Sequence, residues 1–271
     1  MLRTHTISVL VFWAVISGVA FSQPTASSKH NVYGHRDGMA MYYDVEVPVE
    51  SNGLGIVFIV SGGFVSGIEN LTITKPFWEV LLANGYTLFQ LYHPGMPTYR
   101  IPDAVQAVEA GIEHIRLHAD SLGIDPTRLG ALGISSGGYL ALQAALSIDP
   151  VERSENDLKA VVAIMPITDL RTIPPDETLF GVRHMDFDPA LIPGLSPINF
   201  VTPDDPPTLL IHGSRDAVVN LQSNSQALER LLNQSVVNSR LLIVDAGHEI
   251  FPEPVMQLSH EAMLEWFEAH L

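Results

Sequence analysis

The segment Gly133-Ile134-Ser135-Ser136-Gly137 sets a serine between two glycines in the order Gly-x-Ser-x-Gly. An apolar run typical of a buried strand precedes it, and small and apolar residues typical of a helix follow it. In this strand–turn–helix context the serine hydroxyl is exposed on a sharp turn, as a nucleophile requires. We predict that Ser135 is the nucleophile and that the NH of Ser136, at the helix start, binds a developing oxyanion. There are two alternatives. Ser136 could be the nucleophile instead, or Ser135 could simply begin a glycine-rich helix and have no catalytic role.

A serine attacks well only when a base accepts its proton and an acid orients that base. Among the eleven histidines, His248 follows the apolar run 240–245. This is the expected carboxyl end of a strand, where open α/β sheets form their sites. We therefore predict His248 as the base. The histidines expected to be structural or solvated are His30, His35, His212, His260 and His270.

Two aspartates compete for the role of the orienting acid. Asp216 comes just after the apolar run 208–213, at another strand end, and Asp245 lies three residues before His248. A carboxylate so close in the same turn is better placed to accept backbone NH groups than to reach the far ring nitrogen. We predict Asp216 as the acid, with Asp245 as the alternative. The order Ser135, Asp216, His248 is also the order found in hydrolases with this serine turn.

Apolar runs and helical patterns alternate along the rest of the chain. The runs lack a two-residue alternation, which is typical of parallel strands buried on both faces. The strands are expected at 55–60, 87–93, 128–134, 160–166, 208–213 and 240–245, and the helices from near Pro76 to Asn84-Gly85 and at 103–119, 136–147, 221–232 and 254–269. This order predicts an α/β fold with a mostly parallel central sheet and helices on both faces.

Two further segments complete this prediction. Asp37-Gly38 separates two β-rich stretches and favours a tight hairpin, so an antiparallel entry is expected at the N-terminal side. The interval 167–207 contains eight prolines and no clear strand. A loop of that length in a compact domain is usually functional, so we predict a lid-like binding wall there; a passive surface excursion is the alternative.

The N-terminus resembles a cleavable leader. Arg3 precedes the apolar run 7–20, and Ala20-Phe21-Ser22 supplies small residues before the expected cut. Fourteen residues rise only about 21 Å as a helix, less than the roughly 30 Å of a hydrocarbon core, so no stable membrane anchor is expected after cleavage. The prediction is a signal peptide at 1–22, a linker at 23–31, a single domain at 32–271, and a secreted or periplasmic location.

Composition excludes several classes of protein. The chain is 46% hydrophobic and 16% charged, which is typical of a globular domain, and its formal charge of −16 argues against nucleic-acid partners. It has no cysteine, so it has no disulfide, thiolate metal site or cysteine nucleophile. His114 and His118 have the spacing of a metal pair, but no third ligand completes a site. We predict no metal and no cofactor.

Taken together, these residues resemble the α/β-hydrolases, and within them the BD-FAE-like and hormone-sensitive-lipase-like carboxylesterases. The likeness rests on the segments around Ser135, Asp216 and His248 and runs from about residue 32 to the C-terminus. In such relatives an HGGGW-like loop supplies oxyanion-hole NH groups. The matching stretch here is Val60-Ser61-Gly62-Gly63-Phe64, so the resemblance implies that Gly62 and Gly63 are donors although the histidine and the first glycine are replaced.

These observations predict an exported serine carboxylesterase that acts through an acyl-enzyme intermediate on a small-molecule or glycan-linked ester. A serine peptidase of the same fold is one alternative, although such peptidases usually carry an additional large domain. A catalytically silent binding protein of the same fold is the other, although silent relatives commonly lack a triad residue.

Overall fold

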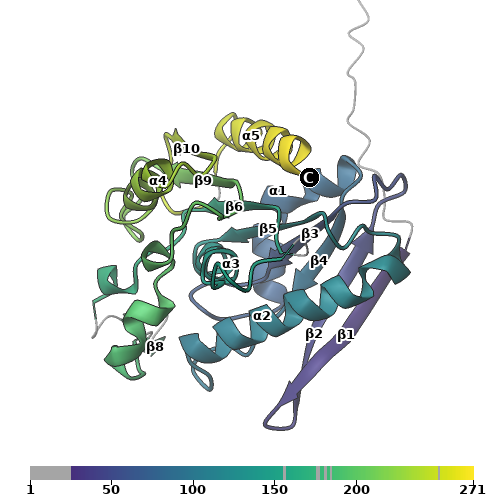
Figure 1. The fold of residues 1–271 in the computed structure, drawn as a ribbon, viewed down its shortest axis with the longest axis horizontal. Coiled ribbons are helices and arrows are strands. Elements are labelled where there is room, and N and C mark those ends of the chain that lie inside the picture. Colours follow the sequence, from purple (N-terminus) through teal and green to yellow (C-terminus); the bar gives the residue numbers. More distant parts are fainter. Residues whose placement is uncertain (1–25, 155–156, 175–177, 180–181, 184, 250) are drawn as a thin grey trace, which may run out of the picture.

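An eight-stranded sheet forms the centre of the computed structural model, which describes residues 26–154, 157–174, 178–179, 182–183, 185–249 and 251–271 (Figure 1). The strand order is β1-β2-β4-β3-β5-β6-β9-β10. All neighbours from β4 to β10 pair in parallel, whereas β1 with β2 and β2 with β4 pair antiparallel. The predicted α/β fold, a mostly parallel sheet with an antiparallel entry, is confirmed.

The strands of the sheet are β1 (Ala26–Arg36), β2 (Met39–Val47), β3 (Gly55–Ile59), β4 (Thr87–Leu91), β5 (Leu129–Ile134), β6 (Ala160–Ile164), β9 (Thr208–Gly213) and β10 (Ser239–Val244). Every residue of β3, β4, β5, β6 and β9 is buried. Such burial on both faces explains why these strands carry unbroken apolar runs rather than alternating ones.

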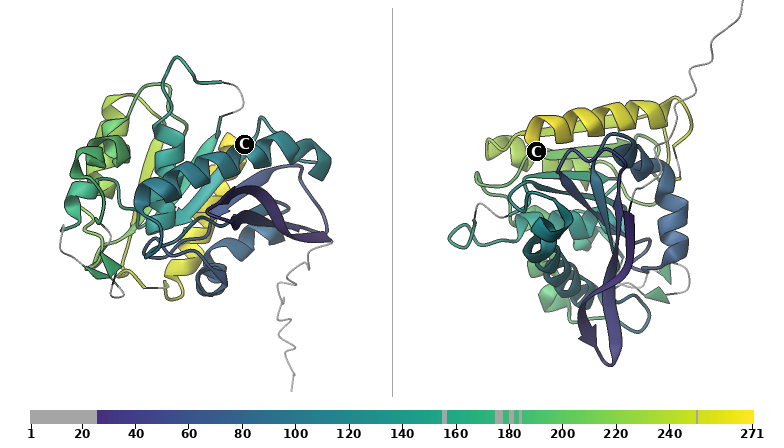
Figure 2. Two further views of the ribbon diagram at one scale, coloured as in Figure 1. Left: turned by 90° about the horizontal axis from the view of Figure 1, so that it is seen from below. Right: turned by 90° about the vertical axis from the view of Figure 1, so that its right-hand side faces the viewer.

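The helices are α1 (Ile68–Ala83), α2 (Ile101–His118), α3 (Ser136–Leu146), α4 (Ser225–Gln234) and α5 (Val255–His270). Helices α1 and α5 cover one face of the sheet, and α2, α3 and α4 cover the other (Figure 2). Successive side chains of one strand therefore enter different cores: Val57 packs with α2 and α3, whereas Phe58 packs with α1 and α5. The sheet is thus held rigidly from both sides.

The N-terminal hairpin forms where it was predicted. Asp37 and Gly38 connect β1 to β2, and both have positive φ angles, 50° and 81°. That combination defines the tight turn whose twist matches paired strands. The predicted linker 23–31 is wrong from Ala26 onward, because β1 begins there and its first three residues pair with β2. The polar composition fits an edge strand, since pairing needs only the backbone. Residues 1–25, including the predicted leader, lie outside the described residues.

Helix α1 begins at Ile68, eight residues before the predicted start near Pro76. Proline is common in the first turn of a helix. Here Pro76 lies inside the helix, where it cannot donate a backbone hydrogen bond. The helix continues because its buried residues Leu71, Phe77, Trp78, Leu81 and Leu82 pack into the core on both sides of the proline.

The described part of the excursion at 167–207 contains short 3₁₀ turns at Leu170–Thr172, Pro189–Leu195 and Pro197–Asn199. It also contains a two-residue strand pair, β7 (Thr178–Leu179) with β8 (Val182–Arg183), which the sequence pattern did not indicate. The 3₁₀ turns are anchored to the domain, since the Tyr139 hydroxyl donates to the Leu195 carbonyl at 2.7 Å. The excursion therefore contacts the helix that follows Ser135.

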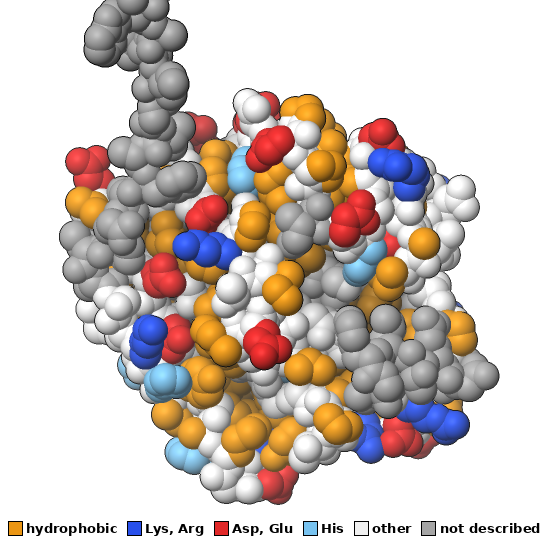
Figure 3. Space-filling model, turned by 180° about the vertical axis from the view of Figure 1, so that it is seen from behind, with side chains coloured by type: hydrophobic (Ala, Val, Ile, Leu, Met, Phe, Trp, Pro, Cys, Tyr) orange, Lys and Arg blue, Asp and Glu red, His pale blue; other side chains and the backbone are white. Residues whose placement is uncertain are grey.

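The surface carries its charges in dispersed form. On the face seen in Figure 3, basic side chains are scattered among acidic and apolar ones rather than gathered into one patch. Within the part of the chain that the structure describes, no helix is both long and apolar enough to cross a bilayer.

His93, two residues after β4, carries a pH-dependent part of the stability. It is 6% exposed, its Nδ1 lies 2.9 Å from the Pro94 carbonyl oxygen, and its Nε2 has no hydrogen-bond partner among the described residues. Burial lowers the pKa of His93 to about 4, and the bond to Pro94 offsets this only in part. The folded protein therefore keeps His93 neutral at a pH where an unfolded histidine is charged.

We predict that His93→Leu makes stability less sensitive to acid. The unfolded chain takes up a proton below about pH 6.5, so this stabilisation is complete above that pH and is lost as the pH falls toward 4, at about 1.4 kcal/mol per pH unit. Urea unfolding of both proteins at several pH values measures the difference, expected to reach on the order of 3 kcal/mol. Parallel pH dependences in the two proteins would contradict it.

Candidate active site

Ser135 lies on a strained turn between β5 and α3. Its φ and ψ angles are 54° and −119°, a combination that a non-glycine residue rarely adopts. The Ser135 NH donates to the Ile164 carbonyl at 2.8 Å, which anchors the turn to β6. A Cβ atom at Gly133 would collide with the Gly137 backbone, and one at Gly137 would come within 2.6 Å of the Ile59 oxygen. Both glycines are therefore required by close packing around the serine.

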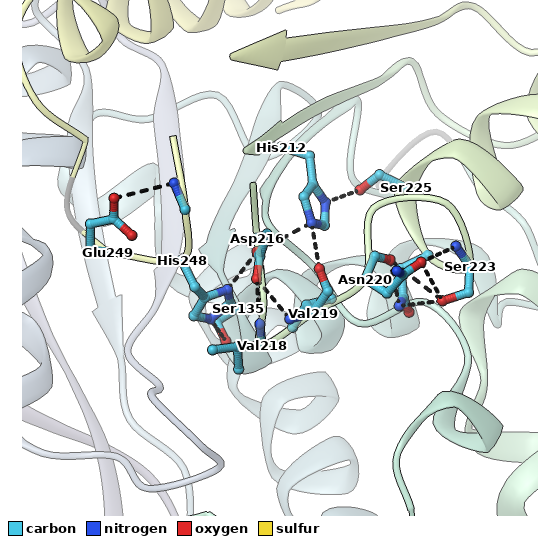
Figure 4. Close-up of polar contacts among 12 residues, drawn as sticks. Ser135, His212, Asp216, Val218, Val219, Asn220, Ser223, Ser225, His248 and Glu249 are labelled. Atoms are coloured by element: carbon cyan, nitrogen blue, oxygen red, sulfur yellow. Dashed lines mark hydrogen bonds and ion pairs between the residues drawn. The ribbon is translucent and has the colours of Figure 1, made fainter. Parts of the chain in front are cut away.

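The structure brings His248 and Asp216 to this turn from two other strand ends (Figure 4). His248, in the loop after β10, places its Nε2 atom 2.9 Å from the Ser135 Oγ atom. Its Nδ1 atom lies 2.7 Å from Asp216 Oδ2, in the loop after β9. The three side chains thus form one continuous hydrogen-bonded line. Such a line can pass a proton from the serine to the imidazole while the carboxylate fixes the ring.

The Asp216 side chain is completely buried and has four hydrogen-bond donors. Its Oδ1 atom accepts the NH groups of Val218 and Val219, each at 2.8 Å. Its Oδ2 atom lies near the ring nitrogens of His248 and, at 3.2 Å, His212. Burial alone would raise the pKa of Asp216, but the hydrogen bonds from the histidines and Val219 outweigh it and hold the pKa well below its usual range. The carboxylate therefore stays ionised at weakly acidic pH.

Asp245, the alternative acid, points away from this line. It forms an ion pair with Arg215 at 2.9 Å, and its side chain is 83% exposed. The structure thus brings Asp216, and not Asp245, to His248.

His114 and His118, which have the spacing of a metal pair, stack with their ring centres 4.0 Å apart. The described residues contain no group of three metal-ligating side chains.

The loop at 60–64 lies beside the serine turn, and its hydrogen bonds bear on the predicted oxyanion donors. The Gly62 NH donates to the Val65 carbonyl at 2.9 Å, so it already has an acceptor in this structure. Gly63 lines the cavities on both sides of Ser135. Ser136 begins α3, where NH groups of the first turn have no acceptor within the helix. Gly63 and Ser136 both line the cavity of about 220 Å³ at Ser135, which Gly62 does not line, and this position favours Gly63 and Ser136 over Gly62.

The hydroxyl groups of Ser61 and Ser136 hold this loop in place, a structural role that the sequence analysis did not predict. The Ser136 Oγ atom lies 2.9 Å from Ser61 Oγ and accepts the Phe64 NH at 3.1 Å. Ser136 is 1% exposed, so its hydroxyl faces the loop rather than solvent. Its side chain therefore fixes the loop to the serine turn. The sequence hints at this contact only through Ser61, which replaces a glycine of the HGGGW-like pattern.

Two cavities meet at Ser135. The first, of about 220 Å³, has walls from the excursion and from the loop after β9. Residues lining it include Ser136, Ile167, Thr172, Ile173, Val219 and Asn220. The second cavity, of about 330 Å³, opens toward α1, and His248 forms part of its wall. Residues lining it include Asn70, Ile73, Phe77, Met165, Val218 and His248. An elongated substrate can therefore extend from the serine in two directions.

The sheet order, the helices on both faces and the serine turn after β5 define this chain as an α/β-hydrolase. The BD-FAE family profile matches residues 44–232, which is more than half of the chain. The protein therefore belongs to the BD-FAE family.

Known proteins of similar sequence and structure carry esterase names. Esterase LipC of Mycobacterium tuberculosis is 29% identical over 251 residues, which cover 81% of this chain and 61% of LipC. The chain thus spans less than two thirds of that relative. A carbohydrate esterase from gut microbiota superposes with a TM-score of 0.72 at 22% identity, covering 92% of this chain and 99% of its own. An acetyl ester-xyloside bifunctional hydrolase from Caldicellulosiruptor lactoaceticus gives 0.73 at 22% identity, with 92% and 95% coverage.

We predict that Asp216→Asn lowers ester hydrolysis far more than Asp245→Asn. The asparagine amide permits the wrong imidazole tautomer, and losing the orienting acid typically costs about 10⁴ in kcat. An exposed ion pair such as Asp245 with Arg215 contributes little, so its loss should change kcat by less than about threefold. Steady-state kinetics on one short-chain ester, with circular dichroism to confirm folding, makes the comparison. A folded, active Asp216→Asn beside an inactive Asp245→Asn would reverse the assignment.

Proposed function

We propose that this protein is a serine carboxylesterase with Ser135, His248 and Asp216 as its catalytic triad. The observation that carries the proposal is the pair of contacts made by one ring, His248 Nε2 to Ser135 Oγ at 2.9 Å and His248 Nδ1 to Asp216 Oδ2 at 2.7 Å. The esterase names of the similar proteins support the same reaction class.

The reaction proceeds in two halves. Ser135 Oγ attacks the ester carbonyl carbon and its proton moves to His248 Nε2, while the NH groups of Gly63 and Ser136 hold the oxyanion. The tetrahedral species collapses, the ester C–O bond breaks, and His248 Nε2 gives its proton to the leaving alcohol. A water then gives a proton to His248 and attacks the acyl-enzyme. Ser135 regains its proton as the carboxylic acid departs.

Because Asp216 stays ionised, loss of activity at weakly acidic pH reports protonation of His248 rather than of the acid. A protonated imidazole cannot accept the Ser135 proton.

The position of His248 also assigns a role to each of the two cavities. His248 must protonate the leaving alcohol, and it lines the cavity of about 330 Å³, so this cavity holds the alcohol portion. The cavity of about 220 Å³ then holds the acyl portion.

We also propose that the substrate is a small or glycan-linked ester and that the protein is exported. One structurally similar protein is described as a carbohydrate esterase and another as an acetyl ester-xyloside bifunctional hydrolase, which supports the first point. The leader-like sequence at 1–22 supports the second. Recovery of a chain that starts at Gln23 from the periplasm or medium would agree with export, whereas an intact Met1 in the cytosol would contradict it.

We predict that Ser135→Ala abolishes ester turnover, with a loss of about 10⁴ to 10⁶ in kcat, because the covalent step needs this hydroxyl. Labelling by a fluorophosphonate, followed by mass spectrometry, should disappear as well. Ser121→Ala, at an exposed serine, is the matched control and should keep both ester turnover and fluorophosphonate labelling.

A second assay separates the classes of function. Turnover of a para-nitrophenyl ester but not of an aryl-amide peptide indicates an esterase rather than a peptidase, and turnover of neither would favour a binding protein.

We predict that Ile73→Phe and Ile173→Phe change specificity in different ways. Ile73 lines the proposed alcohol cavity and Ile173 the proposed acyl cavity, so each phenylalanine should fill one of them. Values of kcat/KM for acetate esters of increasingly large alcohols should fall about tenfold or more in Ile73→Phe alone, because the ring occupies space that the larger alcohols need. Ethyl esters of increasingly long acids should fall in Ile173→Phe alone. The opposite pattern would exchange the two cavities without affecting the triad.

A further inference from the structure

His212 lies in β9, one residue before the strand ends, and it is completely buried. Sequence reasoning treated it as a structural histidine. Its ring, however, lies against the catalytic acid (Figure 4). The Nε2 atom is 2.9 Å from the Val219 carbonyl oxygen and 3.2 Å from Asp216 Oδ2. Both partners are acceptors, so Nε2 must carry the hydrogen and donate it between them.

The opposite ring nitrogen determines whether that hydrogen is present. His212 Nδ1 lies 2.7 Å from the Oγ atom of Ser225, the first residue of α4, which is also completely buried. In a neutral ring with its hydrogen on Nε2, Nδ1 is an acceptor, and the Ser225 hydroxyl supplies the donor. Ser225 thus stabilises the tautomer that points a hydrogen at Asp216.

The Oδ2 atom of Asp216 therefore receives two ring N–H groups, from His248 at 2.7 Å and from His212 at 3.2 Å. The Oδ1 atom receives two backbone NH groups at 2.8 Å. With both oxygens bonded on two sides, the carboxylate cannot rotate without breaking a buried hydrogen bond. His212 also ties the carboxylate to the Val219 carbonyl, so the loop after β9 and the acid are held by the same ring.

We propose that His212 is a positioning residue for the reaction: it holds the Asp216 carboxylate where that group orients His248, and Ser225 keeps His212 in the tautomer required for this. The proposal rests on the proposed esterase function. His212 acts only through Asp216 and does not contact Ser135. Because His212 and His248 share one oxygen, removing His212 leaves that oxygen a stronger acceptor for the His248 Nδ1–H group. The protonated form of His248 is then favoured.

Two substitutions at position 212 test this. His212→Leu fills similar volume without a donor, whereas His212→Gln places an amide NH near the position of Nε2. In His212→Leu we expect kcat to fall about 10- to 100-fold, as for a misplaced catalytic group, with KM changed less than about threefold. The acid limb of the pH profile of kcat/KM should move to higher pH. His212→Gln should recover most of kcat, and Ser225→Ala should lie between the wild type and His212→Leu.

The control is His260→Leu. His260 is a partly buried histidine in α5, and its Nε2, like that of His212, donates to a backbone carbonyl, that of Pro76 at 2.7 Å. It should cost stability without moving the pH profile. The other charged groups near His248 stay the same in all variants, since Arg215 pairs with Asp245 and Glu249 accepts the Gly247 NH.

The outcomes separate this proposal from the proposed function. A wild-type protein without ester turnover would overturn both. An active wild type with His212→Leu unchanged in kcat and in pH profile would overturn only the role of His212. Equal effects of His212→Leu and His260→Leu on kcat and on the pH profile would also overturn it, because His212 would then contribute only to the packing of the core. If His212→Leu does not fold, Ser225→Ala and His212→Gln carry the test, and an unchanged pH profile in Ser225→Ala overturns the tautomer argument.

Discussion

The site depends on one buried carboxylate that remains ionised. Moving a carboxylate out of water is costly unless its oxygens are fully hydrogen-bonded. Asp216 meets that condition with two backbone NH groups and two histidine ring nitrogens. Each donor comes from a segment that the sheet holds in place: the loop after β9, β9 itself, and the loop after β10. The charge can therefore be buried only because the folded arrangement that places His248 beside Ser135 also supplies these four donors.

The same sheet explains the strain at the nucleophile. Ser135 keeps its unusual backbone conformation because β5 and α3 are both anchored and because Gly133 and Gly137 leave room for the neighbouring backbone. The Ser136 hydroxyl then fixes the loop that contains Gly63. Nucleophile, acid, base and oxyanion loop thus follow the carboxyl ends of four parallel strands, β5, β9, β10 and β3, so none of them can move far without disturbing a parallel strand.

The sequence predicts the fold well because unbroken apolar runs leave few arrangements other than a parallel sheet with helices on both faces. It also picks Ser135, Asp216 and His248, since the serine turn and two strand ends restrict the choice. It fails where tertiary packing overrides local preference, as at Pro76 inside α1 and at the strand that starts at Ala26. It cannot identify His212 or the Ser61–Ser136 pair, because those contacts join residues whose closeness only the folded sheet creates.

Proton NMR of protein labelled with ¹⁵N-histidine tests the role of Asp216 most directly. The His248 Nδ1–H group, 2.7 Å from a buried carboxylate oxygen, should give a strongly deshielded proton resonance coupled to a histidine nitrogen. This resonance should be displaced or lost in folded Asp216→Asn and should persist in Ser135→Ala, which leaves the carboxylate intact. Its absence from the wild type, or its persistence in Asp216→Asn, would contradict the account.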